Sequence, residues 1–201
     1  MMKAKAIVFD YGGVICFPPS PDNEAELARL TGLSVTALRE LNRKYRGELD
    51  RGTYDTREFY RFVLSGEGIF PDEDTLEQIA KVDMEGWMRV NPATVQLMRD
   101  IKNSGLTLGI LSNMSHEFLA WASEAVPVMG EADVAVYSST YDVVKPETAI
   151  YEILREQLGC EYGEIVFFDD TADNIAKAAE LGIRGFVWEG PEIARERIAS
   201  L

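Results

Sequence analysis

The sequence of 201 residues predicts an α/β protein with a Rossmann-like parallel sheet core, helices on both faces of the sheet and an inserted α-helical cap. Two observations lead to this fold class. After Pro92, short apolar segments alternate with helical segments, which is typical of a parallel sheet covered by helices. Before it, a block of purely helical patterns follows a first apolar strand. We therefore expect a core of residues 1–15 and 91–201 and a cap of residues 16–90.

The individual elements follow from apolar periodicity and from glycine and cap positions. The first strand is expected to end at Asp10, and the cap helices to begin at N-caps such as Ser34 and Thr56, with Gly47 and Gly52 as interruptions. The expected cap helices are 24–30, 34–45, 56–64 and 74–87. The expected core elements are strand 5–10, helix 94–103, strand 106–111, helix 117–124, strand 134–137, helix 147–158, strand 165–168, helix 173–180 and strand 183–188.

Composition excludes several classes of function. The formal net charge of −14 argues against a nucleic-acid partner, which needs a basic face, and against binding to anionic membranes. The two cysteines, Cys16 and Cys160, do not form a disulfide framework and predict reduced thiols. With no secretory segment or membrane span recognised, we expect a cytoplasmic protein, monomeric or homodimeric.

Polar residues follow the predicted strands at the points where these strands end. They are Asp10, Ser112, Asn113, Asp169 and Asp170. The carboxyl ends of parallel strands meet at one edge of a sheet, where such folds bind ligands. Three clustered carboxylates are costly unless a cation neutralises them or some of them stay protonated. With no His or Cys nearby, they suit a hard ion, and Mg²⁺ is the natural choice. Lys145 can supply a fixed positive charge, so the site is suited to holding a phosphoryl group.

With these residues in place, the chain resembles the haloacid dehalogenase-like (HAD) hydrolase superfamily over essentially its whole length. Four motifs in order carry the resemblance: Phe9-Asp10-Tyr11-Gly12-Gly13-Val14, Leu111-Ser112-Asn113, Val144-Lys145-Pro146, and Phe167-Phe168-Asp169-Asp170-Thr171-Ala172-Asp173-Asn174. Cap residues from Tyr45 to Phe59 are similar to those of small sugar-phosphate phosphatases of the glucose-1-phosphate type. The resemblance implies an Mg²⁺-dependent hydrolase acting on a small phosphorylated metabolite.

The resemblance also implies roles for single residues. Asp10 would be the catalytic nucleophile and carry an aspartyl-phosphate, with Lys145 as its catalytic partner. The implied metal ligands are Asp10, the backbone carbonyl of Gly12, Asp170 and Asp169, with Asn174 supporting them. The implied phosphate-binding residues are Ser112, Asn113, Lys145 and Gly13.

The chain departs from the family pattern at Gly12, where typical phosphatases have an acid–base Asp. Three explanations stay open. The leaving group is good enough to depart with little help, as in a sugar 1-phosphate. A cap group or an ordered water replaces the carboxyl, with Tyr11, Glu48 and Asp50 as candidates. Alternatively, turnover is very slow.

Three rival functions remain at this stage. A 2-haloacid dehalogenase would use the aspartate without a metal, against which the Asp169-Asp170 pair argues. Phosphonate cleavage would need a cap lysine, and Lys44 and Lys81 lie in no recognisable motif. A non-catalytic protein that binds Mg²⁺ and a phosphorylated metabolite is compatible with Gly12.

Other polar and aromatic residues are expected to serve structure. We expect His116 to be an exposed helix residue, and the Glu161 and Glu164 segment to be a solvated loop. The cap aromatics are expected to pack within the helical block rather than to line a substrate pocket: Tyr45, Phe59, Tyr60 and Trp87.

Overall fold

The computed structural model describes residues 3–200, so positions 1, 2 and 201 of the expected core lie outside it. The strands are β1 (Ala6–Phe9), β2 (Thr107–Ser112), β3 (Val134–Tyr137), β4 (Ile165–Asp169) and β5 (Arg184–Val187). The helices are α1 (Pro21–Thr31), α2 (Val35–Arg51), α3 (Thr56–Gly66), α4 (Glu73–Gly86), α5 (Pro92–Asn103), α6 (His116–Ala125), α7 (Ser138–Tyr141), α8 (Thr148–Leu158), α9 (Ala172–Glu180) and α10 (Pro191–Ala199). Short helical turns lie at Tyr11–Ile15, Pro127–Glu131 and Tyr162–Glu164.

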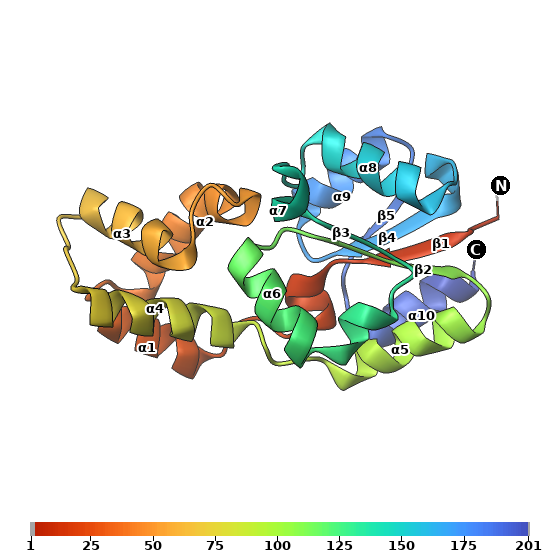
Figure 1. Ribbon diagram of the computed structural model, residues 1–201. Coiled ribbons are helices and arrows are strands. Elements are labelled where there is room, and N and C mark those ends of the chain that lie inside the picture. The colour runs from red at the N-terminus through yellow and green to blue at the C-terminus, as the bar shows by residue number, and fades with distance from the viewer. Residues whose placement is uncertain (1–2, 201) are drawn as a thin grey trace.

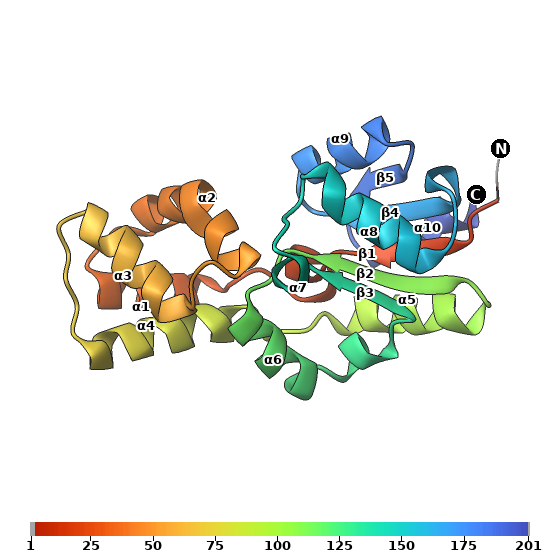
Figure 2. The ribbon, with the colours of Figure 1, turned by 45° about the horizontal axis from the view of Figure 1, so that its top comes forward.

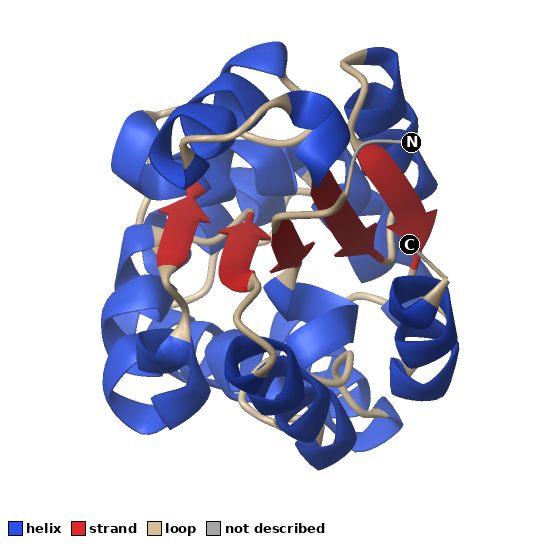
Figure 3. Cartoon of the chain, turned by 90° about the vertical axis from the view of Figure 1, so that its right-hand side faces the viewer, coloured by secondary structure: helices blue, strands red, loops and turns tan. Residues whose placement is uncertain are grey.

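The five strands form one parallel sheet in the order β3-β2-β1-β4-β5. Strand β1 lies at the centre, between β2 and β4, so the residues that follow these three strands emerge side by side. Helices cover both faces of the sheet, as Figures 1 and 3 show. This confirms the predicted α/β Rossmann-like class.

The alternation of side chains along the strands explains the two layers of the core. In β1, Ile7 and Phe9 pack with α5, α6 and α10, whereas Ala6 and Val8 pack with α8 and α9. Both sets are almost completely buried, as expected for a central strand of a parallel sheet. The sheet is thus a rigid platform for the residues beyond its carboxyl edge.

Helices α1 to α4 leave the sheet after β1 and return before α5, and they enclose a separate apolar cluster around Leu49, Phe59 and Leu76. The two crossing segments are tied together. Cys16 forms an antiparallel bridge with Val90, and the Asn91 amide donates to the Ile15 carbonyl at 2.8 Å. The expected boundary between cap and core at 15/16 and 90/91 stays a prediction, although the backbone pairing lies at these positions.

Most predicted elements are present within a few residues of the expected bounds, and α7 and α10 are additional. Two details of the cap differ from expectation. Helix α2 continues through Gly47 to Arg51, because one glycine costs a helix only about 1 kcal/mol. The N-cap of α3 is Asp55 and not Thr56, since the Asp55 carboxylate accepts the Glu58 amide in a capping box.

The extension of α2 matters for the site because it carries the last turn of this helix to the core. In both views α2 ends beside α7 (Figures 1 and 2). Within residues 3–200, the structure has no helix of sufficient length and apolarity to span a membrane.

Candidate active site

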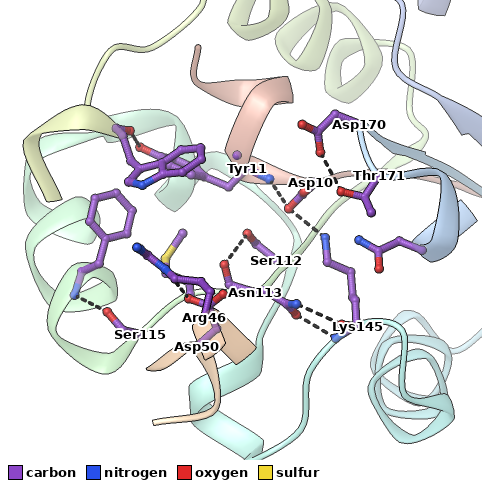
Figure 4. A pocket seen from close by; sticks show the side chains of 15 residues that line it. Asp10, Tyr11, Arg46, Asp50, Ser112, Asn113, Ser115, Lys145, Asp170 and Thr171 are labelled. Carbon is purple, nitrogen blue, oxygen red and sulfur yellow. Dashed lines mark hydrogen bonds and ion pairs between the residues drawn. The ribbon is translucent and has the colours of Figure 1, made fainter. Parts of the chain in front are cut away.

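Three carboxylates meet at the carboxyl edge of the sheet. Asp10 follows β1, Asp169 ends the neighbouring strand β4, and Asp170 is the next residue. One oxygen from each lies within 4.8 Å of the others. The motifs from opposite ends of the chain therefore converge as the sequence predicts (Figure 4).

The turn after β1 is shaped by its glycine pair. The Asp10 carboxylate accepts the Tyr11 amide at 2.7 Å through Oδ1. Gly13 has a φ of 71°, and a Cβ built on it would lie 2.3 Å from Oδ2 of Asp170. Only glycine allows both this backbone conformation and the close approach of Asp170. The predicted phosphate-binding role of Gly13 remains a prediction.

Lys145 lies at the centre of the acidic cluster. Its Nζ is 2.9 Å from Asp10 Oδ1 and 2.6 Å from Asp169 Oδ2, and it donates to the Leu111 carbonyl at 3.0 Å. The side chain is only 1% exposed, so the three bonds compensate its desolvation. The Lys145–Pro146 peptide bond is cis.

Asn113 holds Lys145 in place through the backbone. The Asn113 side chain accepts the Lys145 amide at 2.8 Å and donates to the Lys145 carbonyl at 3.1 Å. The amide group of Asn113 thus positions the lysine, and its predicted contact with phosphate stays untested. The Ser112 hydroxyl has only a 3.4 Å contact with the Asn113 carbonyl, and it lines the cavity, where it is available to a ligand.

Asp169 is fully buried, and both of its oxygens have donors. Oδ1 accepts the Thr171 amide at 2.8 Å, Oδ2 accepts Lys145, and the Asn174 amide reaches both oxygens at 3.0 and 3.1 Å. These contacts anchor the lysine and leave Asp169 less available to a metal than its neighbours. By contrast, the described contacts of Asp10 all go to Oδ1, which leaves its Oδ2 without a donor from residues 3–200.

Burial and neighbouring charges together shift the pKa values of the site. Burial raises the pKa of Asp10 to about 7, although the charge of Lys145 opposes the shift. Burial and the charge of Asp169 also raise the pKa of Asp170. For Lys145, burial lowers the pKa, but the charges of Asp10 and Asp169 outweigh it and raise the pKa above its usual value. The cluster is therefore under electrostatic strain that a cation would relieve.

The cap contributes to the same cavity. Arg46 and Asp50, one turn apart on α2, line it together with Trp87, which follows α4. In Figure 4, Arg46 and Asp50 lie on the other side of Asp10 from Asp170. Sequence reasoning missed Arg46 and assigned Trp87 to packing. The Arg46 and Asp50 spacing of four residues was the available signal, since it puts both on one face of a helix.

The other residues singled out from the sequence lie elsewhere. Phe59 and Tyr60 are buried in the cap cluster, and Tyr45 packs edge-on against Phe62, as expected. His116 is exposed at the start of α6 and does not line the cavity. Glu48, a candidate to replace a missing acid, is exposed and accepts the Thr53 hydroxyl.

The Trp87 ring lies next to Gly12. A Cβ at Gly12 would lie 3.3 Å from the Trp87 ring, and the Tyr11 hydroxyl donates to the Trp87 carbonyl at 3.0 Å. Tyr11 is therefore committed to a structural bond, and burial raises the pKa of its hydroxyl well above the usual value. The cavity measures about 270 Å³.

The donor set fits a hard divalent cation. Asp10 and Asp170 offer carboxylate oxygens beside one another, and the cluster contains neither His nor Cys. With all groups ionised, three carboxylates against one ammonium leave a charge of −2.

Comparisons with known proteins identify the family. Residues 4–182 match the family model described as haloacid dehalogenase-like hydrolase. The chain is 25% identical over 193 residues to Phosphatase MT3486 of Mycobacterium tuberculosis (92% of this chain, 88% of that protein). It is 24% identical over 196 residues to an (S)-2-haloacid dehalogenase of Pseudomonas putida (90% of this chain, 83% of that protein).

Solved structures extend the likeness to the fold. A HAD family enzyme from Bacteroides thetaiotaomicron, in complex with magnesium and inorganic phosphate, superposes with a TM-score of 0.72 at 20% identity, covering 92% of this chain and 93% of that one. The family match covers most of the chain, and its relatives include both phosphatases and dehalogenases. This chain belongs to the haloacid dehalogenase-like hydrolases and is a hydrolase.

Proposed function

We propose that the protein is an Mg²⁺-dependent phosphatase of a small phosphomonoester, with a sugar phosphate as the preferred class, acting through an aspartyl-phosphate on Asp10. The observation that carries this proposal is the charge of the site. A cluster of three carboxylates and one ammonium repels an anionic substrate unless a divalent cation joins it. Mg²⁺ would offset the excess negative charge of the site and so allow an anionic phosphomonoester to bind.

Asp10 is suited to attack phosphorus. The Tyr11 amide and Lys145 fix its Oδ1, which orients the carboxylate and leaves Oδ2 without a donor from the described residues. Attack by Asp10 expels the alcohol and leaves the phosphoryl group on the carboxylate, and water then releases inorganic phosphate. The Ser112 hydroxyl can donate to the phosphoryl oxygens, and Lys145 supplies positive charge beside them.

Asp10, Asp170 and the Gly12 carbonyl are the groups that would hold Mg²⁺. When bound, the ion supplies charge stabilisation to the transferring phosphoryl group. Asp169 and Asn174 would contribute indirectly, because they hold Lys145 and the start of α9 in register with Asp170.

The size of the cavity supports a small substrate. At about 270 Å³, it lies just below the usual range of ligand pockets, which begins at about 300 Å³. A phosphorylated monosaccharide is of suitable size, and its hydroxyls match the polar lining that Asp50, Ser112 and Arg46 provide. A phosphorylated metabolite of this size is the ligand that we propose.

Haloacid dehalogenation is the second candidate, because an (S)-2-haloacid dehalogenase is similar to this chain over 90% of its length. The charge of the site argues against it, since a haloacid is itself a carboxylate. Of the cations lining the cavity, Lys145 contacts two carboxylates and Arg46 contacts Asp50 and Asp83. Neither is left unneutralised for a substrate carboxylate.

The test measures phosphate release from p-nitrophenyl phosphate and from a panel of sugar phosphates, with Mg²⁺ and with EDTA. We expect turnover with Mg²⁺ only, and none in Asp10→Asn, which lacks the nucleophilic oxygen. Asp173→Asn is the matched control, because this residue belongs to the same motif region but is exposed. The same samples are assayed for halide release from 2-chloropropionate.

Halide release that persists in EDTA would establish the dehalogenase instead. Full phosphatase activity in Asp10→Asn would remove this residue from the mechanism. A single stoichiometric release of phosphate without sustained turnover would favour a binding protein over an enzyme.

A further inference from the structure

We infer that Asp50, on the cap, is the proton donor and acceptor of the reaction, protonating the leaving oxygen and then activating water. The inference rests on the proposed phosphatase function and goes beyond it, by assigning acid–base catalysis to a residue of α2 rather than of the sheet edge.

The other carboxyl groups of the site and the Tyr11 hydroxyl are committed elsewhere. Asp10 is the nucleophile, and both oxygens of Asp169 already have donors. Asp170 belongs to the proposed metal site, and the Tyr11 hydroxyl donates to a backbone carbonyl. Among the carboxyl groups that line the cavity in residues 3–200, this leaves Asp50.

The direction of attack places the leaving oxygen near the cap. In phosphoryl transfer, the nucleophile and the leaving oxygen lie roughly in line on opposite sides of phosphorus. Asp10 approaches from the carboxyl edge of β1, so the leaving oxygen faces away from the sheet. The cap lies on that side, and Asp50 enters the cavity from α2 (Figures 1 and 4).

Asp50 is firmly placed through its backbone but loosely held through its carboxylate. The Ser138 hydroxyl donates to the Asp50 carbonyl, and the same hydroxyl accepts the Met114 amide at 2.8 Å, which ties α2 to the core. The carboxylate has one long contact, 3.4 Å from Arg46 Nε. Arg46 makes its shorter bonds, both 2.9 Å, to Asp83.

The environment shifts Asp50 toward its protonated form. Its side chain is 14% exposed, and burial raises its pKa although Arg46 opposes the shift. A carboxyl group whose pKa is raised toward the working pH can give up a proton in one step and regain it in the next. No side chain from position 12 offers this function, and the Trp87 ring lies 3.3 Å from where a Cβ at Gly12 would be.

The proton balance closes over two steps. As an Asp10 oxygen bonds to phosphorus, the bond from phosphorus to the leaving oxygen breaks, and this oxygen takes the electron pair and the Asp50 proton. The alcohol departs and leaves Asp50 ionised. Asp50 then takes a proton from water, whose oxygen attacks phosphorus. The bond from phosphorus to Asp10 breaks and releases phosphate. Asp10 is then again a carboxylate, and Asp50 is again protonated.

The test compares leaving groups in Asp50→Asn, which keeps the size of the side chain. An alkoxide needs a proton to depart, whereas p-nitrophenolate does not. With glycerol phosphate, we expect turnover to fall by about 10²–10⁴-fold. With p-nitrophenyl phosphate, we expect a rapid burst of one nitrophenolate per active site, followed by slow turnover, since the second step still lacks its base.

The matched control is Glu48→Gln, which removes an exposed carboxylate two residues away on the same helix. It is expected to leave both rates unchanged. Formate added to Asp50→Gly should restore part of the lost activity, which a purely structural role would not allow. Thermal unfolding of each variant verifies that it is folded.

An equal loss on both substrates without a burst, or a glycerol phosphate rate within a few-fold of the wild-type rate, would overturn the assignment of Asp50. Absence of phosphatase activity in the wild-type protein would instead defeat the proposed function itself, so the two failures are distinguishable.

Discussion

The core and the cap each place a cation between two aspartates, but they hold these groups differently. In the core, Lys145 makes close contacts with both Asp10 and Asp169. In the cap, Arg46 bonds closely to Asp83, to which the Tyr60 hydroxyl also donates at 2.9 Å, and only distantly to Asp50. The core network fixes the nucleophile, whereas the cap network leaves one carboxyl group free to exchange a proton.

The difference follows from the elements that carry the two networks. The two core carboxylates lie at the ends of the adjacent strands β1 and β4, whose register fixes their separation. The cap groups lie on α2 and α4, two helices of a separate apolar cluster, and the end of α2 contacts the core at α7. The carboxyl edge of a sheet is rigid and is suited to positioning a nucleophile. A cap helix is suited to bringing an acid–base group to the substrate after the substrate has entered.

The largest effect is expected from removing the core cation. Lys145→Met leaves Asp10 and Asp169 uncompensated, and breaking a buried pair of this kind costs about 3–5 kcal/mol. We expect a large fall in the free energy of unfolding, measured by urea denaturation, and loss of phosphatase activity. Lys177→Met removes a lysine whose pair with Glu180 lies at the surface, and it should change neither. An active and stable Lys145→Met variant would show that the core does not depend on its buried cation.

The next effect concerns the cap cation. Arg46→Met leaves the buried Asp83 without its ion-pair partner, which lowers the free energy of unfolding by about 3 kcal/mol. It also removes the charge that favours ionised Asp50, so the pKa of Asp50 rises further. Because the first step needs protonated Asp50, activity falls as pH rises through this pKa. The alkaline limb of kcat/KM should therefore move to higher pH.

Asp83→Asn sharpens this test because it acts in the opposite direction. The Asp83 charge raises the pKa of Asp50, so its removal should lower that pKa and move the alkaline limb to lower pH. Identical pH profiles of kcat/KM for the wild type and both variants would show that Asp50 does not set the alkaline limb.

A smaller effect is expected at the turn after β1. Gly13→Ala places a methyl group where Asp170 lies and adds the cost of a positive φ, about 1 kcal/mol. We expect weaker Mg²⁺ affinity, measured by calorimetry. Gly105→Ala has the same backbone cost, with a φ of 84°, but no neighbour within 4 Å of its Cβ. It should lose stability and keep its Mg²⁺ affinity, and equal affinities in the two variants would contradict the role of Gly13.

The smallest effect concerns contact between the two regions. Arg51 of the cap pairs with Glu147 of the core and donates to the Asp142 carbonyl. Because this pair is partly exposed, Arg51→Ala is expected to raise KM by about five-fold at most, and less at high salt. Arg29→Ala removes an ion pair within α1 and should leave KM unchanged. A KM change in Arg51→Ala that does not respond to salt would argue against an electrostatic origin.

Much of the core could be predicted from the sequence because local signals and fold rules agree there. Apolar strands ending at Asp10 and Asp169 are buried on both faces, and parallel strands bring their ends together. The acidic cluster of Asp10, Asp169 and Asp170 follows directly from this rule. The roles of Asp169 and Asn113 in holding Lys145 do not, because they depend on side-chain contacts between distant segments.

The cap was less predictable for the same reason. Nothing near Gly47 in sequence shows that α2 continues to Arg51, since a single glycine weakens a helix without ending it. Nor does local sequence place Trp87 against Gly12, 75 positions away along the chain. Predicted packing was right for Phe59 and Tyr60 but wrong for Trp87, which lines the cavity.

By itself, then, the sequence determined the order of strands and helices, the acidic edge and the family, because these depend on periodicity and on residues that directly follow strands. Only the tertiary structure decided which carboxyl groups are saturated and which are left to react. That distinction arises from distances across the cavity: Lys145 lies 2.6 Å from Asp169, whereas Arg46 lies 3.4 Å from Asp50. Local sequence does not encode such separations between packed elements.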